Sequence, residues 1–143
     1  MSKSKYLREG RLPEVLALIQ VLAYDKITNR SEQGLAKELQ SKPVSAESWV
    51  DLAKQHPEFF RVRQGEDEEN GGKKDLVSLI SRFVLKKISG SNNRPMLAAD
   101  IVNKLMEIGI EIHDRQVLQR DRWKLYTPII VAVIAAAVKI LMS

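Results

Sequence analysis

The chain begins with apolar residues at the spacing of a helix. Val15, Leu18, Ile19 and Leu22 follow one another at i, i+3, i+4 and i+7, so they share one face when the backbone is helical. Pro13 suits the first helical position, where no backbone donor is needed. The pattern therefore predicts an amphipathic helix that begins near Pro13 and buries one side.

Two shorter helices are predicted next, on either side of a break at SKPV (residues 41–44). Ser31 can cap a helix that runs through Gln40. Proline disfavours helical geometry in the residue before it, so this helix should not continue through the break. Ser45 is then expected to cap a third helix, which should end before Pro57.

After the third helix the period of the pattern changes to that of a strand. Residues 59–64 (FFRVRQ) alternate apolar and polar after the first Phe, as a half-buried strand does. Residues 65–75 form a polar, glycine-containing loop. Residues 76–87 (LVSLISRFVLKK) are rich in β-branched residues, although their apolar spacing also fits a helix. We prefer a return strand here, because a lone strand would leave its backbone groups unpaired.

Three helices followed by a hairpin, with a tight link between the second and third helices, resemble the winged-helix family. The resemblance covers about residues 12–85 and rests on the order and period of the elements. It is carried by SEQGLAKELQ, SKPV, SAESWVDLAKQ, HPEFFRVRQ and LVSLISR. The resemblance implies one of two uses, because many winged-helix domains lay the third helix in the DNA major groove and many others bind proteins.

A linker and two further helices are predicted before the C-terminal tail. Residues 88–95 (ISGSNNRP) have the composition of a linker. Residues 96–109 carry apolar residues along one stripe, and Gly109 is expected to stop that helix. Asp114 can cap a final helix that runs toward the tail, and Pro128 is expected to kink or interrupt it.

The tail over residues 125–142 (LYTPIIVAVIAAAVKILM) has the character of a membrane anchor. Its length corresponds to roughly 27 Å of helix, near the ~30 Å hydrocarbon core of a bilayer. Lys139 is its only charge, and Trp123 and Tyr126 sit where an aromatic belt would lie. Basic residues upstream of the tail favour a cytoplasmic N-terminal domain. The tail therefore predicts a single C-terminal span, with a helix buried in the core or in an oligomer as the alternative.

The predicted fold class is mainly α. It combines a winged-helix-like domain, made of three helices and a β-hairpin, with a helical stalk and a C-terminal transmembrane helix. The 143 residues have room for one such domain and its appendages. The expected segments are an N-terminal tail (1–11), the winged-helix-like domain (12–88), a linker (89–95), the stalk (96–124) and the anchor (125–143).

Few residues of this chain could support catalysis or bind a metal. The sequence has no cysteine, which excludes disulfides, thiolate metal sites and cysteine nucleophiles. Its two histidines, His56 and His113, are too few for a histidine metal site, and the acidic run 66–69 lacks the alternating ligands of a calcium loop. There is no glycine-rich phosphate loop and no G-x-S-x-G elbow. We therefore expect no catalytic, cofactor-binding or metal-binding residues and no enzymatic activity.

The distribution of charge disfavours nucleic acid as the partner. The net charge is +5, but the third predicted helix carries Glu47 and Asp51 against Lys54 alone. The loop of the hairpin is acidic over residues 66–69, which would repel phosphates. The remaining candidate nucleic-acid contacts are Lys54, Arg61, Arg63, Lys73 and Lys74.

The predicted function is protein recognition or scaffolding at a membrane surface, with the lipid bilayer and an unidentified protein as partners. The alternative is a membrane-tethered transcription regulator that binds DNA through the third helix and the hairpin. A third hypothesis is a soluble protein whose apolar tail is buried in an oligomer. Ala132, Ala135 and Ala136 form a strip of small residues through which the span could self-associate, so a second copy of the chain is a further candidate partner.

Overall fold

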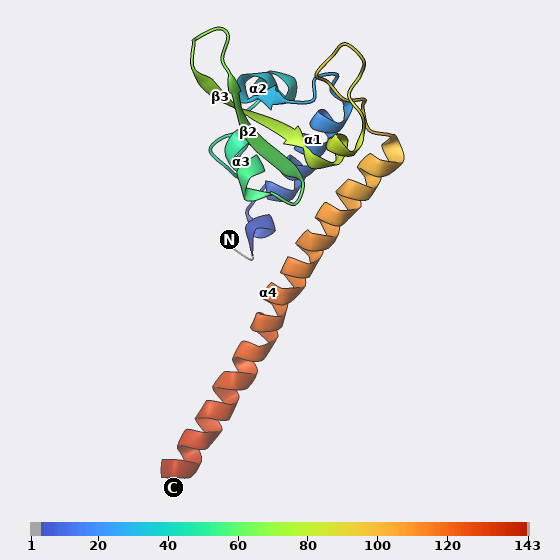
Figure 1. The fold of residues 1–143 in the computed structure, drawn as a ribbon. Coiled ribbons are helices and arrows are strands. Elements are labelled where there is room, and N and C mark those ends of the chain that lie inside the picture. The colour runs from blue at the N-terminus through green and yellow to red at the C-terminus, as the bar shows by residue number, and fades with distance from the viewer. Residues whose placement is uncertain (1–3, 143) are drawn as a thin grey trace.

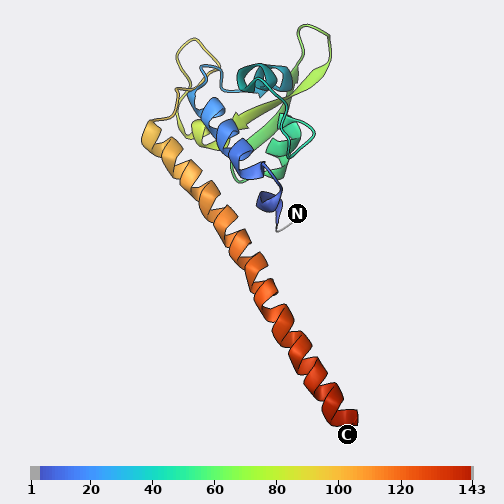
Figure 2. The same cartoon turned by 180° about the vertical axis from the view of Figure 1, so that it is seen from behind.

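The computed structural model describes residues 4–142, except for the side chains of residues 123–127. In chain order the elements are η1 (Lys5–Leu7), α1 (Arg11–Tyr24), β1 (Arg30–Ser31), α2 (Glu32–Leu39), α3 (Trp49–Gln55), β2 (Phe60–Glu66), β3 (Lys73–Leu79), η2 (Ile80–Val84) and α4 (Ala99–Met142). Figure 1 shows α1, α2 and α3 gathered around a small sheet, while α4 begins beside this domain and runs away from it. The view from behind, in Figure 2, shows the same arrangement.

Helix α1 buries the face that the sequence predicts. All four apolar residues of that face are fully buried, which confirms the prediction. The helix begins at Arg11, directly after Gly10, whose φ of 76° lies in the left-handed region that glycine adopts without strain. Pro13 therefore lies in the first turn, where its missing N–H leaves no hydrogen bond unmade.

The cap of α2 agrees with the sequence, but α3 begins later than predicted. Ser31 caps α2, and its Oγ accepts a hydrogen bond from the first turn at 3.2 Å. The cap of α3 is Ser48, whose Oγ accepts a hydrogen bond from the N–H of Asp51 at 3.0 Å. Ser45 is engaged by α1 instead, because its hydroxyl accepts a hydrogen bond from Arg11 Nε at 2.9 Å.

Glu32 ties the start of α2 to the start of α3. Its two carboxylate oxygens accept hydrogen bonds from the backbone N–H groups of Trp49 and Val50, both at 2.9 Å. The first N–H groups of a helix have no partner inside the helix, and the helix dipole favours a negative charge beside them. Glu32 therefore stabilises a helix that starts at Trp49, after the Ser48 cap.

The described strands form one antiparallel sheet of order β1-β3-β2. Strands β2 and β3 are paired so that Phe60 lies opposite Leu79. Because successive side chains of a strand point to opposite faces, Phe60 and Val62 face the core while Arg61 and Arg63 are exposed on the other face. This alternation decides where the basic residues of the hairpin lie.

The return strand predicted over residues 76–87 is only partly correct. Strand β3 ends at Leu79, and the chain continues directly into the 3-10 helix η2. The guanidinium of Arg82 is fully buried and donates hydrogen bonds to the carbonyl oxygens of Leu22 at 2.8 Å and Asp25 at 2.6 Å. These bonds hold Arg82 against the end of α1. If β3 continued as an extended strand, residue 82 would lie too far along the strand to make them.

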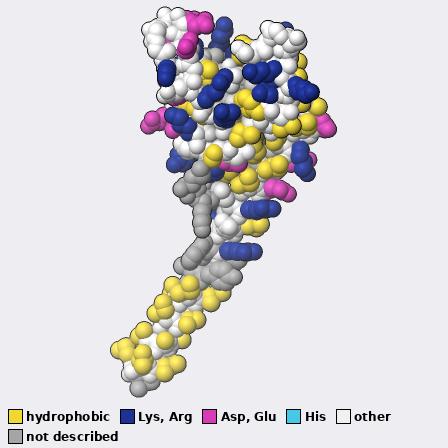
Figure 3. Space-filling model, in the orientation of Figure 1, with side chains coloured by type: hydrophobic (Ala, Val, Ile, Leu, Met, Phe, Trp, Pro, Cys, Tyr) yellow, Lys and Arg dark blue, Asp and Glu magenta, His cyan; other side chains and the backbone are white. Residues whose placement is uncertain are grey.

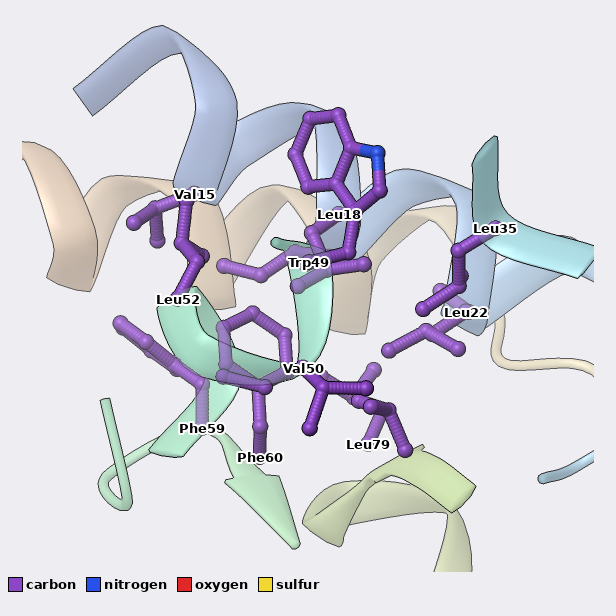
Figure 4. Packing of buried hydrophobic residues seen from close by; sticks show 14 of the residues in the cluster. Val15, Leu18, Leu22, Leu35, Trp49, Val50, Leu52, Phe59, Phe60 and Leu79 are labelled. Atoms are coloured by element: carbon purple, nitrogen blue, oxygen red, sulfur yellow. The ribbon is translucent and has the colours of Figure 1, made fainter. Parts of the chain in front are cut away.

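An apolar core lies between α1, α3 and the sheet, as Figure 4 shows for its labelled residues. Leu18, Trp49 and Phe60 are buried in this core, whereas Leu39 is only partly buried against it. The Trp49 indole Nε1 also donates a hydrogen bond to the carbonyl oxygen of Ser41 at 2.8 Å. The ring is therefore positioned by a polar bond as well as by packing.

Helix α4 is continuous over 44 residues, where the sequence predicts two helices and a kinked tail. Gly109 does not stop the helix but faces the domain. A Cβ added there would lie 3.4 Å from Leu16 Cδ2 and 3.7 Å from Phe59 Cζ. This position therefore has room for one methyl group in ordinary contact and for little more. Asp114 and Pro128, predicted as a cap and a kink, also lie inside the helix.

The segments on either side of residues 12–88 also pack on the domain. Tyr6 in η1 is 1% exposed. In the loop before α4, the Asn93 side chain accepts a hydrogen bond from the N–H of Thr28 at 3.1 Å. The N–H of Arg94 donates to Thr28 Oγ1 at 2.7 Å. The packed part of the chain therefore includes residues that the sequence assigns to a tail and a linker.

The prediction of a C-terminal transmembrane helix is wrong. Among the described residues, no helix combines the length and the apolar character needed to cross a bilayer. Before residue 128, α4 mixes charged and apolar residues, and residues 128–142 correspond to about 22 Å of helix against ~30 Å of hydrocarbon. This finding overturns the transmembrane part of the fold class, the single-pass membrane description and the predicted location. The side chains of Trp123 and Tyr126, on which the predicted aromatic belt depends, lie outside the described residues.

Candidate interaction site

A groove of about 410 Å³ lies between α2, α3 and the β2–β3 hairpin. The charged residues that line it are mostly acidic. They are Glu32, Asp51, Lys54, Asp67, Lys74 and Asp75. We call this surface the acidic groove.

Each lysine of the acidic groove is paired with a carboxylate. Lys54 Nζ lies 3.5 Å from Asp75 Oδ2, and Lys74 Nζ lies 3.8 Å from Asp67 Oδ1. A hydrogen bond from the Asn70 side chain holds the pKa of Asp67 below its ordinary value, which keeps this carboxylate ionised. Four carboxylates against two lysines leave the groove with two net negative charges.

The five basic residues predicted as nucleic-acid contacts do not share one surface. Lys54 and Lys74 lie in the acidic groove, paired with acids. Lys73 is exposed at the start of β3. Arg61 and Arg63 lie on the other face of β2. Figure 3 shows basic side chains spread over the sheet and the loop before α4, with acidic side chains at the tip of the hairpin.

The fold places five residues beside Arg61 and Arg63 that the sequence does not indicate. The pocket that they line has a volume of about 380 Å³, and they are Asn29, Phe83, Lys87, Asn92 and Arg94. The alternation of β2 signals that the two strand arginines share a face. Nothing in the sequence between β3 and α4 signals that this segment folds back beside them. We call this surface the basic pocket.

A polar network in which Tyr6 and His56 are buried joins η1 and α1 to the end of α3. The Glu58 carboxylate accepts hydrogen bonds from the Tyr6 hydroxyl, from Lys5 Nζ at 2.8 Å and from His56 Nδ1 at 2.9 Å. His56 Nε2 lies 3.1 Å from Arg11 Nη1. Because a guanidinium only donates, Nε2 accepts, and the imidazole is neutral with its proton on Nδ1.

Burial and hydrogen bonding together set the protonation states of this network. Burial opposes ionisation of Glu58, but hydrogen bonds from His56, Lys5 and Tyr6 outweigh it and lower its pKa to about 2. Burial, followed by the hydrogen bond to Glu58, raises the pKa of Tyr6, and burial lowers the pKa of His56. Tyr6 is 1% exposed and His56 is fully buried, so a substrate cannot reach either ring. We therefore assign the network a structural role.

The other candidates from the sequence lie apart from both surfaces. His113 Nδ1 lies 3.2 Å from Oδ1 of its neighbour Asp114 on α4. Across residues 4–142, no three His, Asp or Glu side chains are grouped so that they could hold a metal ion. Ala132, Ala135 and Ala136 are exposed near the end of α4.

Comparisons with known proteins find no relative of this chain. No family model matches the sequence, and no curated protein or solved structure matches it.

Proposed function

We propose that the chain is a non-catalytic protein-interaction or scaffolding module with a winged-helix-like domain, and that its partner binds in the acidic groove. The order α1, β1, α2, α3, β2, β3 supports the winged-helix assignment, because it places three helices before an antiparallel hairpin. The acidic groove includes α3, which is the element that the resemblance implies for binding.

The charge of the acidic groove carries this proposal. A DNA duplex presents one negative charge per ~1.7 Å of its axis, and a protein that binds it supplies lysines and arginines to neutralise them. Here Lys54 and Lys74 are already paired with Asp75 and Asp67, and the groove keeps a net negative charge. Phosphates would be repelled, whereas a basic protein segment would be attracted.

The chemistry of the groove favours arginine or lysine side chains on the partner. Asp51 and Asp75 are only partly exposed, so a cation between them is partly shielded from water. The Asp51 carboxylate accepts a hydrogen bond from Gln55 Nε2 at 3.1 Å, which holds it in position. A guanidinium can bind such a carboxylate through two parallel hydrogen bonds. We therefore describe the partner as a basic segment of another protein.

The proposal is tested by titrating the full chain with an arginine- and lysine-rich peptide of about ten residues and following backbone amide shifts by NMR. We expect shifts confined to the acidic groove. The double substitution Asp51→Asn/Asp75→Asn should weaken binding about tenfold, because it removes two charge-assisted contacts. The matched control Asp114→Asn/Asp121→Asn removes the same charge from α4, outside the groove, and should bind the peptide normally.

Two results would overturn the proposal. Equal weakening by both double substitutions would show that the peptide responds only to overall charge. Submicromolar binding of one DNA duplex at physiological salt, lost in Lys54→Ala, would instead support a DNA-binding regulator.

A further inference from the structure

The basic pocket lies on the face of β2 that is turned away from the core. Its lining comes from β2, from η2 and the loop that follows it, and from the residues before β1. The basic members are Arg61, Arg63, Lys87 and Arg94. No Asp or Glu lines this pocket within the part of the chain that the structure describes.

These four cations have no carboxylate partner among the described residues. The acidic groove differs in this respect, because each of its lysines is neutralised by an aspartate. Four like charges at the edge of one small pocket repel one another. The repulsion is relieved when an anion enters the pocket, so the pocket is prepared for a multiply charged ligand.

Phe83 organises two of the four cations. The guanidinium carbon of Arg61 lies 5.4 Å from the centroid of the Phe83 ring, and that of Arg94 lies 4.9 Å from it. A guanidinium that packs its flat face on a ring keeps N–H donors at its edge for another partner. Arg94 uses Nη1 to donate to the carbonyl oxygens of Phe83 and Leu85, which leaves Nε and Nη2 for a ligand.

The backbone around the pocket is held in place before any ligand binds. Buried Arg82 donates to backbone carbonyls at the end of α1 and to the carbonyl oxygen of Arg94. Thr28 is hydrogen-bonded to Asn93 and Arg94. Such pre-ordering lowers the entropic cost of binding.

We propose that the basic pocket binds an oligophosphate group, that is, two or more linked phosphates, either as inorganic pyrophosphate or as the phosphate end of a nucleotide. One phosphate carries a charge of about −1.5 to −2 at neutral pH, and a second linked phosphate adds further negative charge, so two phosphates offset more of the charge of the four cations than one does. Arginine suits this ligand, because its planar fork of donors matches the spacing of phosphate oxygens. A volume of about 380 Å³ also accommodates a small anionic group.

A single-stranded nucleic acid is the competing class of ligand, and the geometry disfavours it. Proteins that bind single strands stack bases on aromatic rings. Phe83 is only partly exposed, and two guanidiniums already pack on its ring. The acidic loop at the tip of the hairpin, residues 66–69, would repel a polyanion that continued along β2.

The test measures binding of inorganic pyrophosphate, adenosine diphosphate and inorganic phosphate to the full chain by calorimetry, at matched ionic strength. We expect pyrophosphate and the nucleotide to bind about tenfold or more tightly than phosphate. Equal affinity for the first two would assign recognition to the phosphates alone. Tighter binding of the nucleotide would show that its sugar and base also contact the pocket. Either outcome supports the proposal.

The variant Arg63→Gln/Lys87→Gln should lower the affinity for pyrophosphate about tenfold or more, because two charge-assisted contacts are lost. Both side chains are exposed, so its thermal unfolding without ligand should stay close to that of the unsubstituted chain. The matched control Lys42→Gln/Lys73→Gln removes the same charge from exposed positions outside the pocket and should bind normally.

Three results would overturn this inference. The first is no binding of pyrophosphate or the nucleotide at millimolar concentration. The second is equal weakening by the control. The third is tighter binding of a short single-stranded RNA than of pyrophosphate through Arg63 and Lys87, which would make this face a nucleic-acid surface.

Discussion

The substitution Glu58→Gln removes the charge at the centre of the polar network around Tyr6 and His56 while keeping the size of the side chain. Hydrogen bonds from His56, Lys5 and Tyr6 favour the ionised carboxylate. A fall in its pKa from 4.5 to about 2 corresponds to about 3 kcal/mol of stability at neutral pH. The Glu58 side chain is 27% exposed, so screening by solvent reduces this to about 1–2 kcal/mol.

Urea denaturation at several pH values is the assay. At pH 7 the free energy of unfolding of the variant should be about 1–2 kcal/mol lower than that of the unsubstituted chain. The folded state lowers the pKa of Glu58, so its contribution is complete above about pH 4.5 and is lost as the pH falls toward 2. The gap between the two proteins should therefore narrow by about half or more at pH 3.

Glu9→Gln is the matched control, because Glu9 is an exposed carboxylate between η1 and α1, the two elements that the network joins to the end of α3. It should change the free energy of unfolding by less than about 0.5 kcal/mol. A Glu58→Gln gap that stays constant from pH 7 to pH 3 would show that the loss arises from packing or hydrogen-bond geometry, and the electrostatic reasoning would be refuted.

Substitutions at two further positions test the packing of the domain. Trp49→Ala should lower the free energy of unfolding by about 3–5 kcal/mol in urea, because the indole is 3% exposed in the core; an unchanged value would refute its place there. Gly109→Ala should raise the thermal midpoint through a gain of about 0.5–1 kcal/mol, since its Cβ would meet Leu16 Cδ2 at an ordinary contact distance of 3.4 Å. Gly109→Leu should lower the thermal midpoint by forcing α4 away from α1. A higher midpoint for the leucine variant than for the alanine variant would contradict this packing.

Local spacing predicts α1 and the first hairpin strand because their buried residues repeat at the period of the element itself. The start of α3 is different. Ser45 and Ser48 are both suitable caps, and the choice depends on Glu32, which reaches from α2 to the N–H groups of Trp49 and Val50. The start of α3 is therefore set by a contact between two helices. The spacing of residues along α3 alone gives no information about that contact.

The network around Glu58 and the basic pocket also depend on contacts between distant segments, which local sequence patterns do not predict. Tyr6 and Glu58 lie 52 positions apart in sequence, so their hydrogen bond has no local signature. The sequence predicts part of the basic pocket, because Arg61 and Arg63 are two positions apart on one strand and must share a face. Arg94 joins them only because Arg82 is buried at the end of α1 and turns the following chain back.

Because α4 is one continuous helix, its number of residues sets both the distance of its C-terminal end from the domain and the rotation of that end about the helix axis. The Gln116 side chain still accepts a hydrogen bond from the N–H of Tyr6 at 3.0 Å, and Figures 1 and 2 show the C-terminal part of the helix clear of the domain. From Gln116 to Met142 the helix extends about 39 Å, and each residue turns it by about 100°. One inserted residue in this stretch would rotate every later side chain by about 100° relative to the acidic groove while moving it only about 1.5 Å farther away. The orientation of the far end is therefore more sensitive to insertion or deletion than its reach is.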